Sequence, residues 1–365
     1  MSVVIAGGGT GGHIEPALAL ADALREADPE TLITCLGTER GLETRLVPAR
    51  GYDLALIPPV PLPRSLTPQL LSVPSRMAAS VGAAVKILDR TRAQVLVGFG
   101  GYVATPGYLA AWRRGVPIVV HEANSRPGLA NRIGARLTSR VFTGQPGVRM
   151  PHGRYIGIPI RRQIARLDRL ALTDEARAHL GLRPDLPVLL VTGGSQGARS
   201  INRAVLGAAR ELAASGIQVL HIIGPKNADV PVPPRGEVPY VVLPYLDRMD
   251  VGYAAADFAL CRGGAMTCAE MTAVGLPAAY VPLPHGNGEQ RMNALPIEQA
   301  GGGLIVADNE LTPEWIIGTL LPVLLDAELL AAMSKAAAGT GHRDTDRLLA
   351  AEVLEVASRS NPRHR

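Results

Sequence analysis

One pattern occurs twice in this chain of 365 residues: a short apolar run, a glycine-rich turn and a helical segment with apolar periodicity. The first copy begins with the run at 3–6 and turns at GGGTGG, residues 7–12. The second begins with PVLLVT at 187–192 and turns at GGSQG, residues 193–197. Continuous apolar strands alternating with helices are typical of parallel sheets covered on both faces. We therefore predict two α/β domains, each built on a parallel sheet.

The alternation also predicts the main elements. We expect one domain at 1–160 and a second at 161–341, joined through the segment 157–185; a last helix at about 342–358 can pack on either. In the first domain, strands are expected at 3–6, 32–36, 95–98, 118–121 and 141–143, with helices at 16–27, 68–88, 106–114 and 128–137. In the second, strands are expected at 187–192, 218–223, 240–243, 258–261 and 278–281, with a helix at 198–214.

The composition is that of a folded globular protein, with 47% hydrophobic and 19% charged residues. Only 4% of the residues are aromatic, which disfavours stacking platforms for nucleic acid, so no nucleic-acid partner is expected. Cys35, Cys261 and Cys268 are odd in number and lack zinc spacing, which favours a reducing, cytoplasmic compartment. The N-terminus lacks signal-peptide features, and no apolar run reaches the ~18–20 residues that cross a bilayer.

Positive charge is concentrated in the first half of the chain. Residues 1–160 contain 17 Lys and Arg against 10 Asp and Glu, a balance of +7, whereas residues 161–365 contain 20 against 22, a balance of −2. The first half is therefore expected to meet something anionic, either phosphate groups or an acidic membrane surface. Ordinary arginine solvation is the alternative, and the charge count alone does not reject it.

The first glycine turn matches G-x-G-x-x-G, the dinucleotide fingerprint, through Gly7, Gly9 and Gly12. A dehydrogenase should also carry an acid at the end of its second strand, where Glu39 is only a loose candidate, and no P-loop lysine follows. Such a turn still lets backbone N–H groups and a helix N-terminus approach a phosphate. His13 lies in the first helical turn, where the helix dipole favours a neutral imidazole that can accept a proton. A capping or packing histidine fits the spacing equally well.

Two further turns connect a strand to a helix through glycine. In the turn at 193–197, Ser195 and its neighbouring N–H groups are suited to a diphosphate, with a tight structural turn as the alternative. After the strand at 258–261, Glu270 lies one turn into a helix, where a carboxylate can accept both hydroxyls of a ribose. A surface acid that complements the helix dipole is the alternative for Glu270.

Polar side chains follow two more strands. Gln290 and Asn293 are amides of the type that hold sugar hydroxyls, and HEAN at 121–124 is expected to place polar groups on the ligand side. Turn chemistry is the alternative for both. DTD at 344–346 matches the metal-binding D-x-D of some sugar-nucleotide enzymes, but no strand precedes it, and we interpret it as a helix cap. Because ligands of open parallel sheets bind beyond the carboxyl ends of the strands, we expect a site in a cleft between the domains.

Taken together, these motifs resemble the MurG family, the N-acetylglucosaminyltransferases of peptidoglycan synthesis. The resemblance covers nearly the whole chain, roughly from Val3 to Leu354, and five motifs in register are specific where one glycine turn is not. The stretches at 13–24 and 253–270 resemble the actinobacterial version. The five motifs are GGTGGH at 8–13, GFGGY at 98–102, HEAN at 121–124, GGSQGA at 193–198 and EQRMNA at 289–294.

This resemblance implies a GT-B fold, two Rossmann-like domains facing across a cleft, with no metal and no cofactor. The donor would be UDP-N-acetylglucosamine (UDP-GlcNAc). The acceptor would be lipid I, whose muramoyl 4-hydroxyl displaces UDP with inversion to give lipid II. Carried over, the C-terminal domain holds the donor: Glu270 at the ribose, Leu246 at the uracil, and Ala265 and Met266 lining the pocket. The remaining donor-side residues are Gly194, Ser195, Gln196, Gly197 and Arg161 at the diphosphate, and Gln290 and Asn124 at the N-acetylglucosamine.

The resemblance assigns the first glycine turn to the acceptor. Thr10, Gly11 and Gly12 are expected to border the sugar site and receive the acceptor's diphosphate. His13 is the expected general base, because a sugar hydroxyl must lose its proton as it attacks. Helix N-termini would stabilise the departing UDP in place of a metal.

Members of the family dock on the membrane through their first domain. The expected location is therefore peripheral, on the cytoplasmic side of the cell membrane, with the anionic inner leaflet and cell-wall synthesis proteins as partners. Candidates for the docking patch are Leu66, Leu70, Leu71, Met77, Trp112, Arg76, Lys86, Arg113 and Arg114, although the apolar members can instead belong to the core.

Three other functions compete with this interpretation. A same-fold transferase acting on another acceptor would differ in the loops at 102–107 and 126–129. A scaffold that binds the lipid-linked precursor without catalysis is disfavoured by the presence of His13, and an oxidoreductase by the missing acid. The sequence departs from many members at Ala123 and Glu289, where glutamine is usual; the first departure is expected to alter a donor contact.

Overall fold

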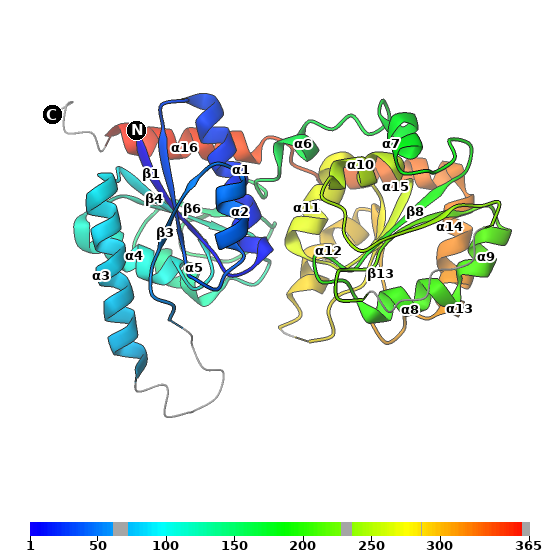
Figure 1. Ribbon diagram of the computed structural model, residues 1–365, viewed down its shortest axis with the longest axis horizontal. Helices are drawn as coiled ribbons and strands as arrows, with labels where there is room; N and C mark the ends of the chain where they lie inside the picture. The colour runs from blue at the N-terminus through cyan, green and yellow to red at the C-terminus, as the bar shows by residue number, and fades with distance from the viewer. Residues whose placement is uncertain (61–71, 228–235, 286, 360–365) are drawn as a thin grey trace. The chain divides into compact units, whose positions relative to one another are not determined.

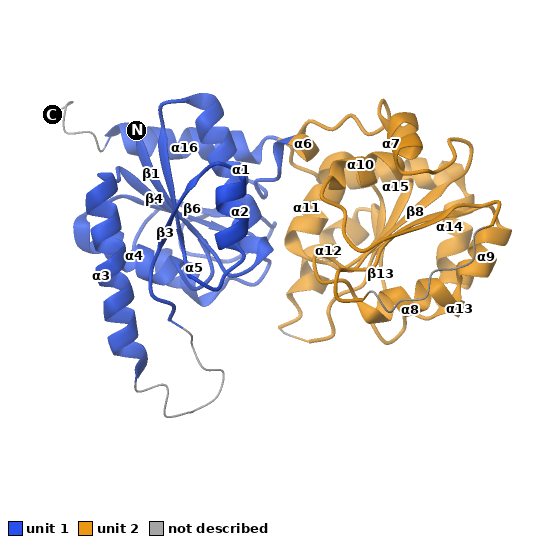
Figure 2. Cartoon of the chain, viewed as in Figure 1, with its two compact units in different colours: residues 1–162, 344–365 blue, residues 163–343 orange. Residues whose placement is uncertain are grey.

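The computed structural model describes residues 1–60, 72–227, 236–285 and 287–359 (Figure 1). The chain forms two compact units: unit 1 contains residues 1–162 and the chain from Asp344 onward, and unit 2 contains residues 163–343 (Figure 2). The chain therefore passes between the units twice, once after Arg162 and once after Arg343. The cleft expected between the two domains stays a prediction.

Unit 1 is built on a seven-stranded, wholly parallel sheet in the order β3-β2-β1-β4-β5-β6-β7. This arrangement is that of a doubly wound, Rossmann-like sheet, and it confirms the five strands predicted in this half. β3 and β7 were not predicted, because β3 is short and half-exposed and β7 is exposed along its whole length. The strands are β1 (Ser2–Gly7), β2 (Leu32–Gly37), β3 (Asp53–Leu56), β4 (Val95–Gly100), β5 (Ile118–Glu122), β6 (Val141–Thr143) and β7 (Gly153–Tyr155).

Helices cover both faces of this sheet (Figure 1). Their apolar faces explain why β1 is buried at all of its residues. The helix predicted at 68–88 is α3, which begins at Val73; the first predicted residues lie outside the described part of the chain. The helices are α1 (Gly11–Ala27), α2 (Glu43–Ala49), α3 (Val73–Thr91), α4 (Ala104–Arg114), α5 (Leu129–Gly134) and α16 (Thr345–Arg359).

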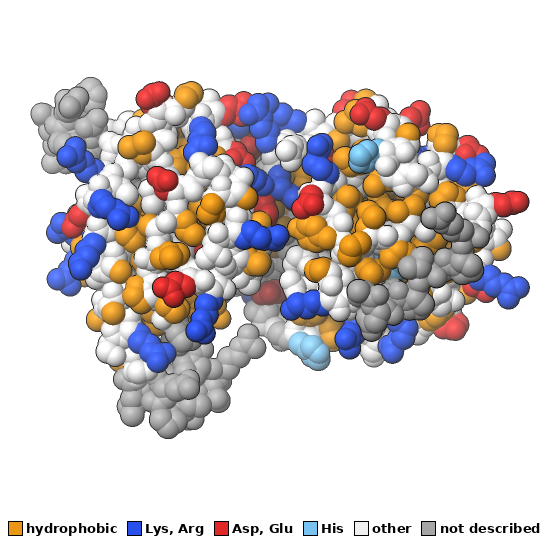
Figure 3. All heavy atoms as spheres, viewed as in Figure 1, with side chains coloured by type: hydrophobic (Ala, Val, Ile, Leu, Met, Phe, Trp, Pro, Cys, Tyr) orange, Lys and Arg blue, Asp and Glu red, His pale blue; other side chains and the backbone are white. Residues whose placement is uncertain are grey.

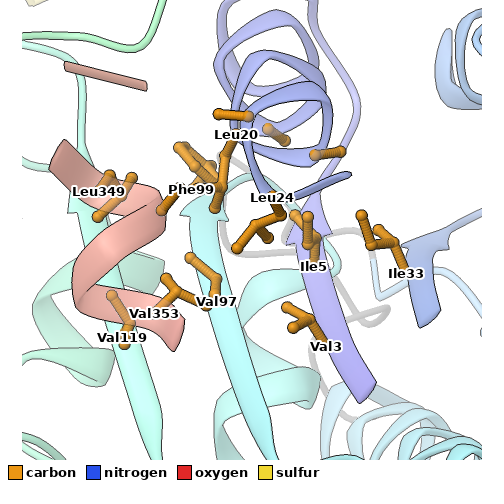
Figure 4. Close-up of a cluster of buried hydrophobic side chains, with 14 of the residues drawn as sticks. Val3, Ile5, Leu20, Leu24, Ile33, Val97, Phe99, Val119, Leu349 and Val353 are labelled. Carbon is orange, nitrogen blue, oxygen red and sulfur yellow. The ribbon is translucent and has the colours of Figure 1, made fainter. Parts of the chain in front are cut away.

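The last helix completes the core of the first unit. Leu349 and Val353 of α16 are fully buried and belong to the same apolar cluster as Leu20 of α1 and Val97 and Phe99 of β4 (Figure 4). Thr345 at the start of α16 donates a 2.9 Å hydrogen bond from its hydroxyl to the backbone oxygen of Ile156. The C-terminal helix is therefore part of the same core as the N-terminal strand and helix.

Unit 2 repeats the architecture with a six-stranded parallel sheet in the order β10-β9-β8-β11-β12-β13. The five predicted strands are confirmed, and β13 is an additional short one. The predicted helix at 198–214 is broken at Ala208, after Gly207, a residue of low helix propensity. The strands are β8 (Val188–Thr192), β9 (Gln218–Ile222), β10 (Tyr240–Leu243), β11 (Phe258–Cys261), β12 (Ala278–Tyr280) and β13 (Gly303–Ile305).

The helices of unit 2 lie on both sides of its sheet (Figure 2). They are α6 (Arg162–Ala165, whose first residue belongs to unit 1), α7 (Thr173–His179), α8 (Arg199–Gly207), α9 (Ala209–Ala214), α10 (Met249–Ala255), α11 (Ala265–Val274), α12 (Glu289–Gln299), α13 (Pro313–Trp315), a π-helical turn at Ile316–Leu320, α14 (Leu321–Leu325) and α15 (Ala327–Thr340).

In the described residues, no single helix has both the length and the apolar character to cross a membrane. One consecutive pair, Pro313–Leu325 with Ala327–Arg359, meets that test only together and is bent by 90° at its break. The three cysteines are buried and free, and burial raises the pKa of the Cys35 and Cys261 thiols to about 12, so both are inert small side chains of the core.

Candidate active site

The first glycine turn, here called loop 1 (residues 7–12), carries the chain from β1 into α1. Thr10 is the N-cap of α1 and has an extended backbone, so the helix begins at Gly11. The N–H groups of Gly11 and Gly12 open the helix, where geometry gives them no acceptor inside it. Gly12 is exposed. The N-terminus of this 17-residue helix is therefore suited to an anionic group.

His13 is held by its neighbours in the first turn of α1. Its Nδ1 lies 3.0 Å from the hydroxyl oxygen of Thr10, and its ring lies against Gly100 at the end of β4, where an added Cβ would be 3.2 Å from Nε2. In the tautomer whose Nδ1–H donates to Thr10, Nε2 carries the lone pair that a general base needs. The geometry is thus compatible with the predicted role.

A buried carboxylate that the sequence analysis did not single out supports loop 1 from below. Glu43, the first residue of α2, is fully buried. One of its carboxylate oxygens accepts the Gly9 N–H at 3.0 Å, and the other accepts the Thr38 N–H at 2.9 Å and the Thr38 hydroxyl at 3.1 Å. Glu39, the loose candidate for a dehydrogenase's acid after the second strand, is exposed. An acid therefore does follow β2, but it is Glu43, and its side chain points to loop 1.

Asn124 belongs to a loop that a second buried carboxylate holds in place. Glu122, the last residue of β5, is 1% exposed and accepts hydrogen bonds from the backbone of Asn124 at 2.9 Å, the backbone of Gly128 at 2.9 Å and the side chain of Asn131 at 2.9 Å. Burial raises the pKa of Glu122, and these hydrogen bonds oppose the shift. Asn131 in turn accepts from the Tyr108 hydroxyl at 2.7 Å. The loop that carries Asn124 is thus fixed by a hydrogen-bond network centred on the buried Glu122.

We expected the HEAN motif at 121–124 to place polar groups on the ligand side, but two of its three polar side chains are buried. His121 is fully buried and its Nε2 lies 2.9 Å from the backbone oxygen of Gly157. Desolvation lowers the pKa of His121 to about 4, so the ring is neutral. Glu122 is buried as well, which leaves Asn124 as the partly exposed polar residue of the motif. The difference follows from the end of β5: His121 and Glu122 belong to this strand, which is buried along its whole length, whereas Asn124 lies beyond it.

The second glycine turn, here called loop 2 (residues 193–197), joins β8 to α8. Gly197 has φ +75°, and a Cβ there would clash with the backbone oxygen of Ile223, so only glycine fits. Asn227 lies beside this contact and donates from its side chain to the backbone oxygens of Gln196 at 3.2 Å and Ile223 at 2.9 Å. Ser195 and Gln196 are exposed. Loop 2 is therefore held from behind through the carbonyl of Gln196, and its tip faces solvent.

A polar cluster adjoins the first turn of α8, next to loop 2. The Ser200 hydroxyl donates to Asp308 at 2.7 Å and accepts from Arg262 at 3.1 Å, and Arg262 also pairs with Asp308. Arg262 directly follows β11, so the cluster connects the ends of the two central strands of unit 2. None of these three residues was predicted, since nothing in their spacing brings them together.

Glu270 lies on α11 and is 5% exposed. Its Oε2 accepts a 2.7 Å hydrogen bond from the Tyr253 hydroxyl of α10. Glu270 is therefore not the exposed helix-dipole acid of the alternative interpretation, but a buried carboxylate with an oriented oxygen. Such a carboxylate is suited to accept hydroxyl groups of a ligand.

The other donor-side residues lie on neighbouring elements of unit 2. Leu246, partly exposed, follows β10 and lies against Gly252 of α10. Ala265 and Met266 begin α11. Gln290, in the first turn of α12, accepts the Leu283 N–H at 2.9 Å through its side-chain oxygen, so its amide nitrogen is the end left to meet a ligand.

The predicted site residues thus fall into two groups at the carboxyl ends of two sheets. Thr10 to His13 and Asn124 lie in unit 1, as does Arg161, which precedes α6 and was expected near the donor diphosphate. The glycines and Ser195 of loop 2 lie in unit 2 with Glu270 and the donor-side residues above. Across the described ranges, no group of three or more His, Cys, Asp or Glu residues is arranged to hold a metal.

Two Rossmann-like sheets, each with a glycine turn at its carboxyl edge, define a class of protein when the halves are compared with known domains. Residues 3–143 match the glycosyltransferase family 28 N-terminal domain, and residues 188–349 match the glycosyltransferase family 28 C-terminal domain. The fold is that of a two-domain, GT-B-type glycosyltransferase.

Curated relatives refine this class. The chain is 64% identical, over 99% of its length and 96% of the relative's, to the UDP-N-acetylglucosamine–N-acetylmuramyl-(pentapeptide) pyrophosphoryl-undecaprenol N-acetylglucosamine transferase of Thermobifida fusca. It is 62% identical to the enzyme of the same name from Streptomyces avermitilis, over the full length of both chains. Among solved structures, MurG of Acinetobacter baumannii is similar at 26% identity and a TM-score of 0.77, over 97% and 99% of the two chains. The chain belongs to the MurG family of glycosyltransferases.

Proposed function

We propose that the protein transfers N-acetylglucosamine from UDP-GlcNAc to the N-acetylmuramyl unit of lipid I, the pyrophosphoryl-undecaprenol pentapeptide acceptor, giving lipid II. The observation that carries this proposal is the 64% identity to a transferase named for this reaction, across 99% of the chain and 96% of the relative. His13, Glu270 and Gln290 are all present, which argues against a non-catalytic scaffold.

Unit 2 is proposed to hold the donor. The exposed tip of loop 2 and the start of α8 receive the diphosphate, because helix N-termini and unpaired N–H groups attract anions. Glu270, oriented by Tyr253, accepts the ribose hydroxyls. Leu246 lies by the uracil, Ala265 and Met266 line the pocket, and Gln290 meets the N-acetylglucosamine, together with Asn124 of unit 1.

Unit 1 is proposed to hold the acceptor and the general base. The muramoyl 4-hydroxyl oxygen forms a bond to the anomeric carbon of the donor while the bond from that carbon to the UDP oxygen breaks. The hydroxyl proton passes to Nε2 of His13, whose Nδ1–H is held by Thr10. Attack opposite the leaving group inverts the anomeric carbon from α to β. The open N–H groups of Gly11 and Gly12 receive the acceptor's diphosphate.

Loop 2 is proposed to stabilise UDP as it leaves. Negative charge develops on the diphosphate as the bond to the sugar breaks, and preorganised N–H groups aimed at that charge lower the barrier. The Arg262–Asp308–Ser200 cluster fixes the start of α8 and so keeps these donors in place. This stabilisation is proposed to need no metal.

The surface formed by α3 and α4 is proposed to dock on the anionic inner leaflet. Trp112 is 64% exposed, and Arg76, Lys86 and Arg113 are exposed on the same pair of packed helices. Figure 3 shows Lys and Arg side chains spread over this side of unit 1. Arg114 pairs with Asp89 instead, Met77 is partly buried, and Leu66, Leu70 and Leu71 lie outside the described residues.

A transfer assay tests the proposed reaction. Purified protein is incubated with radiolabelled UDP-GlcNAc and either lipid I or unrelated aglycone acceptors. We expect label only in the lipid-linked product. Transfer to an aglycone but not to lipid I would instead identify a same-fold enzyme of another pathway. Docking is tested separately by sedimentation with anionic and neutral vesicles: binding should require anionic lipid, and a K86E/R113E double variant should lose it.

A further inference from the structure

Glu43 lies beneath loop 1, and its buried carboxylate makes hydrogen bonds to two separate segments of unit 1. The Glu43 side chain reaches from the start of α2 to a turn 34 residues away in sequence and accepts the Gly9 N–H at 3.0 Å. Its second oxygen accepts both donors of Thr38, which follows β2. Two of the three partners are backbone N–H groups, which can only donate, and the Thr38 hydroxyl donates as well, so both carboxylate oxygens act as acceptors. The group is fully buried, so every one of these bonds is made away from water.

The surrounding backbone is shaped to admit this carboxylate. A Cβ on Gly41 would overlap the carboxyl group itself, and one on Gly37 would lie 2.6 Å from Cγ of Glu43. On the loop side, a Cβ on Gly8 would lie 3.2 Å from Oε1. Glycines from two separate turns thus make room for one side chain. Such a close fit fixes the backbone of Gly8 and Gly9 as well as stabilising it.

The position of Gly9 determines that of the residues proposed to react. Gly9 has φ +89° and immediately precedes Thr10, the N-cap of α1, whose hydroxyl lies 3.0 Å from Nδ1 of His13. Any shift of the Gly9 peptide is therefore passed through one residue to the hydroxyl that orients the imidazole. We propose that Glu43 is a positioning residue of the transfer reaction, which sets the shape of loop 1 and, through Thr10, the placement of His13.

This inference rests on the proposed function, because it assigns Glu43 to the same site. It gives Glu43 no contact with either substrate. Its effect on rate comes from geometry, since misplacement of a reacting group by about 1 Å can lower a rate by about 100-fold. The donor is proposed to bind on unit 2, so its affinity is expected to be independent of Glu43.

Replacing Glu43 with glutamine tests this proposal with little change of volume. A glutamine has one oxygen and one NH₂ group in place of two oxygens, so either the Gly9 or the Thr38 N–H faces another donor. We expect kcat of E43Q to fall by about 10-fold or more, with the affinity for UDP-GlcNAc unchanged by calorimetry. Hydrogen–deuterium exchange of a peptide covering residues 7–13 should become faster.

A matched control separates positioning from general loss of stability. Asp22 of α1 is a second carboxylate of unit 1 with two side-chain partners, Tyr52 and Arg50, each at 2.7 Å. It has no bond to loop 1. D22N should lower the melting temperature of the protein and leave kcat and the exchange of residues 7–13 near wild type. An equal fall of kcat in D22N and E43Q at matched stability would overturn the proposal.

The remaining outcomes also decide. If E43Q keeps kcat within twofold of wild type, Glu43 does not position the reacting groups. If E43Q does not fold, T38V takes its place: it removes one of the three donors, and a fall of kcat of about twofold to fivefold is expected, whereas no change overturns the proposal. If the wild type transfers nothing to lipid I, the proposed function fails. The structural part of this inference is still tested in that case: it is rejected if hydrogen–deuterium exchange of residues 7–13 is the same in E43Q as in the wild type.

Discussion

Loop 1 and loop 2 begin from nearly the same sequence pattern and the same place in their sheets, yet they are supported in opposite ways. Beneath loop 1, the Glu43 carboxylate accepts a loop N–H. Behind loop 2, the Asn227 side-chain amide donates to one loop carbonyl, that of Gln196. The first support is an acceptor that uses one of the loop's N–H groups, and the second is a neutral donor that uses none.

This difference bears on which loop suits a diphosphate. At loop 2, the side chains that contact the described residues of the turn are Thr192 and Asn227, and neither is an acid. The nearby acid, Asp308, is paired with Arg262 beside the first turn of α8. At loop 1 a buried acid lies directly under the backbone, which weakens the attraction for an anion. We therefore expect loop 2 to attract its diphosphate more strongly than loop 1 attracts the acceptor's, and loop 1 to serve in addition to place His13.

The comparison is tested most strongly at His13. If loop 1 serves to place a base, H13A should lower kcat by about 10²–10⁴-fold, while calorimetric affinity for UDP-GlcNAc stays near wild type. Transfer kinetics with lipid I measure the first quantity. Normal turnover in H13A would remove the distinction between the loops, and a large loss of donor affinity would place the nucleotide on unit 1.

A pair of glycine substitutions tests how rigidly loop 2 is held. G197A should destabilise the protein by roughly 3 kcal/mol or more, because a positive φ is strained for alanine and the new Cβ meets the Ile223 backbone. G194A carries the same kind of strain, with φ +83°, but its Cβ would meet open space, so a loss of about 1 kcal/mol is expected. Chemical denaturation measures both. Equal losses would mean that the contact behind loop 2 is not restrictive.

Glu270 sharpens the assignment of the donor to unit 2. E270A should weaken UDP binding by roughly 10–100-fold, since it removes a buried, oriented acceptor for the ribose. Y253F leaves the carboxylate in place and should weaken binding by less, about twofold to fivefold. Titration calorimetry with UDP measures both. Unchanged affinity in E270A would move the ribose site elsewhere.

The last expected effect concerns the pH dependence of stability, and it should be shared by both units. His121 in unit 1 and His221 in unit 2 are fully buried, and desolvation lowers the pKa of each to about 4. Because the unfolded chain binds these protons near pH 6.5, stability is lost as pH falls below that value and continues to fall to about pH 4. At pH 5.5 each histidine should cost roughly 1.4 kcal/mol. Denaturation curves from pH 7 to pH 5 measure the slope, which H121N should reduce.

Much of the fold could be predicted because its central strands are buried on both faces. Val3 and Leu189 lie in runs that read as continuous apolar stretches, and such runs identify parallel strands directly. The missed strands lack this property: β7 is exposed throughout, and β3 and β13 each contain only one buried residue. Their pairing is decided by the neighbouring strand rather than by their own sequence.

The candidate site was predictable where it depends on local pattern and not where it depends on distant contacts. The glycine turns and His13 stand in one short segment each, so their positions between a strand and a helix could be predicted from the local pattern, while their chemical roles stay predictions. Glu43 meets Gly9 across 34 residues and Asn227 meets Gln196 across 31, and no spacing rule predicts such a contact. The expectation of an acid after the second strand named Glu39, whereas the acid that contacts loop 1 is Glu43, four residues later.

The placement of α16 has a consequence for synthesis on the ribosome. Leu349 and Val353 fill the core of unit 1 against Leu20 and Val97, yet they are translated after the whole of unit 2. Until they emerge, the nascent first half exposes an apolar surface that its own residues cannot cover, the kind of surface that chaperones recognise. Residues 1–162 should therefore reach their native packing only after translation, and a chain that stops at residue 343 should be a target for degradation.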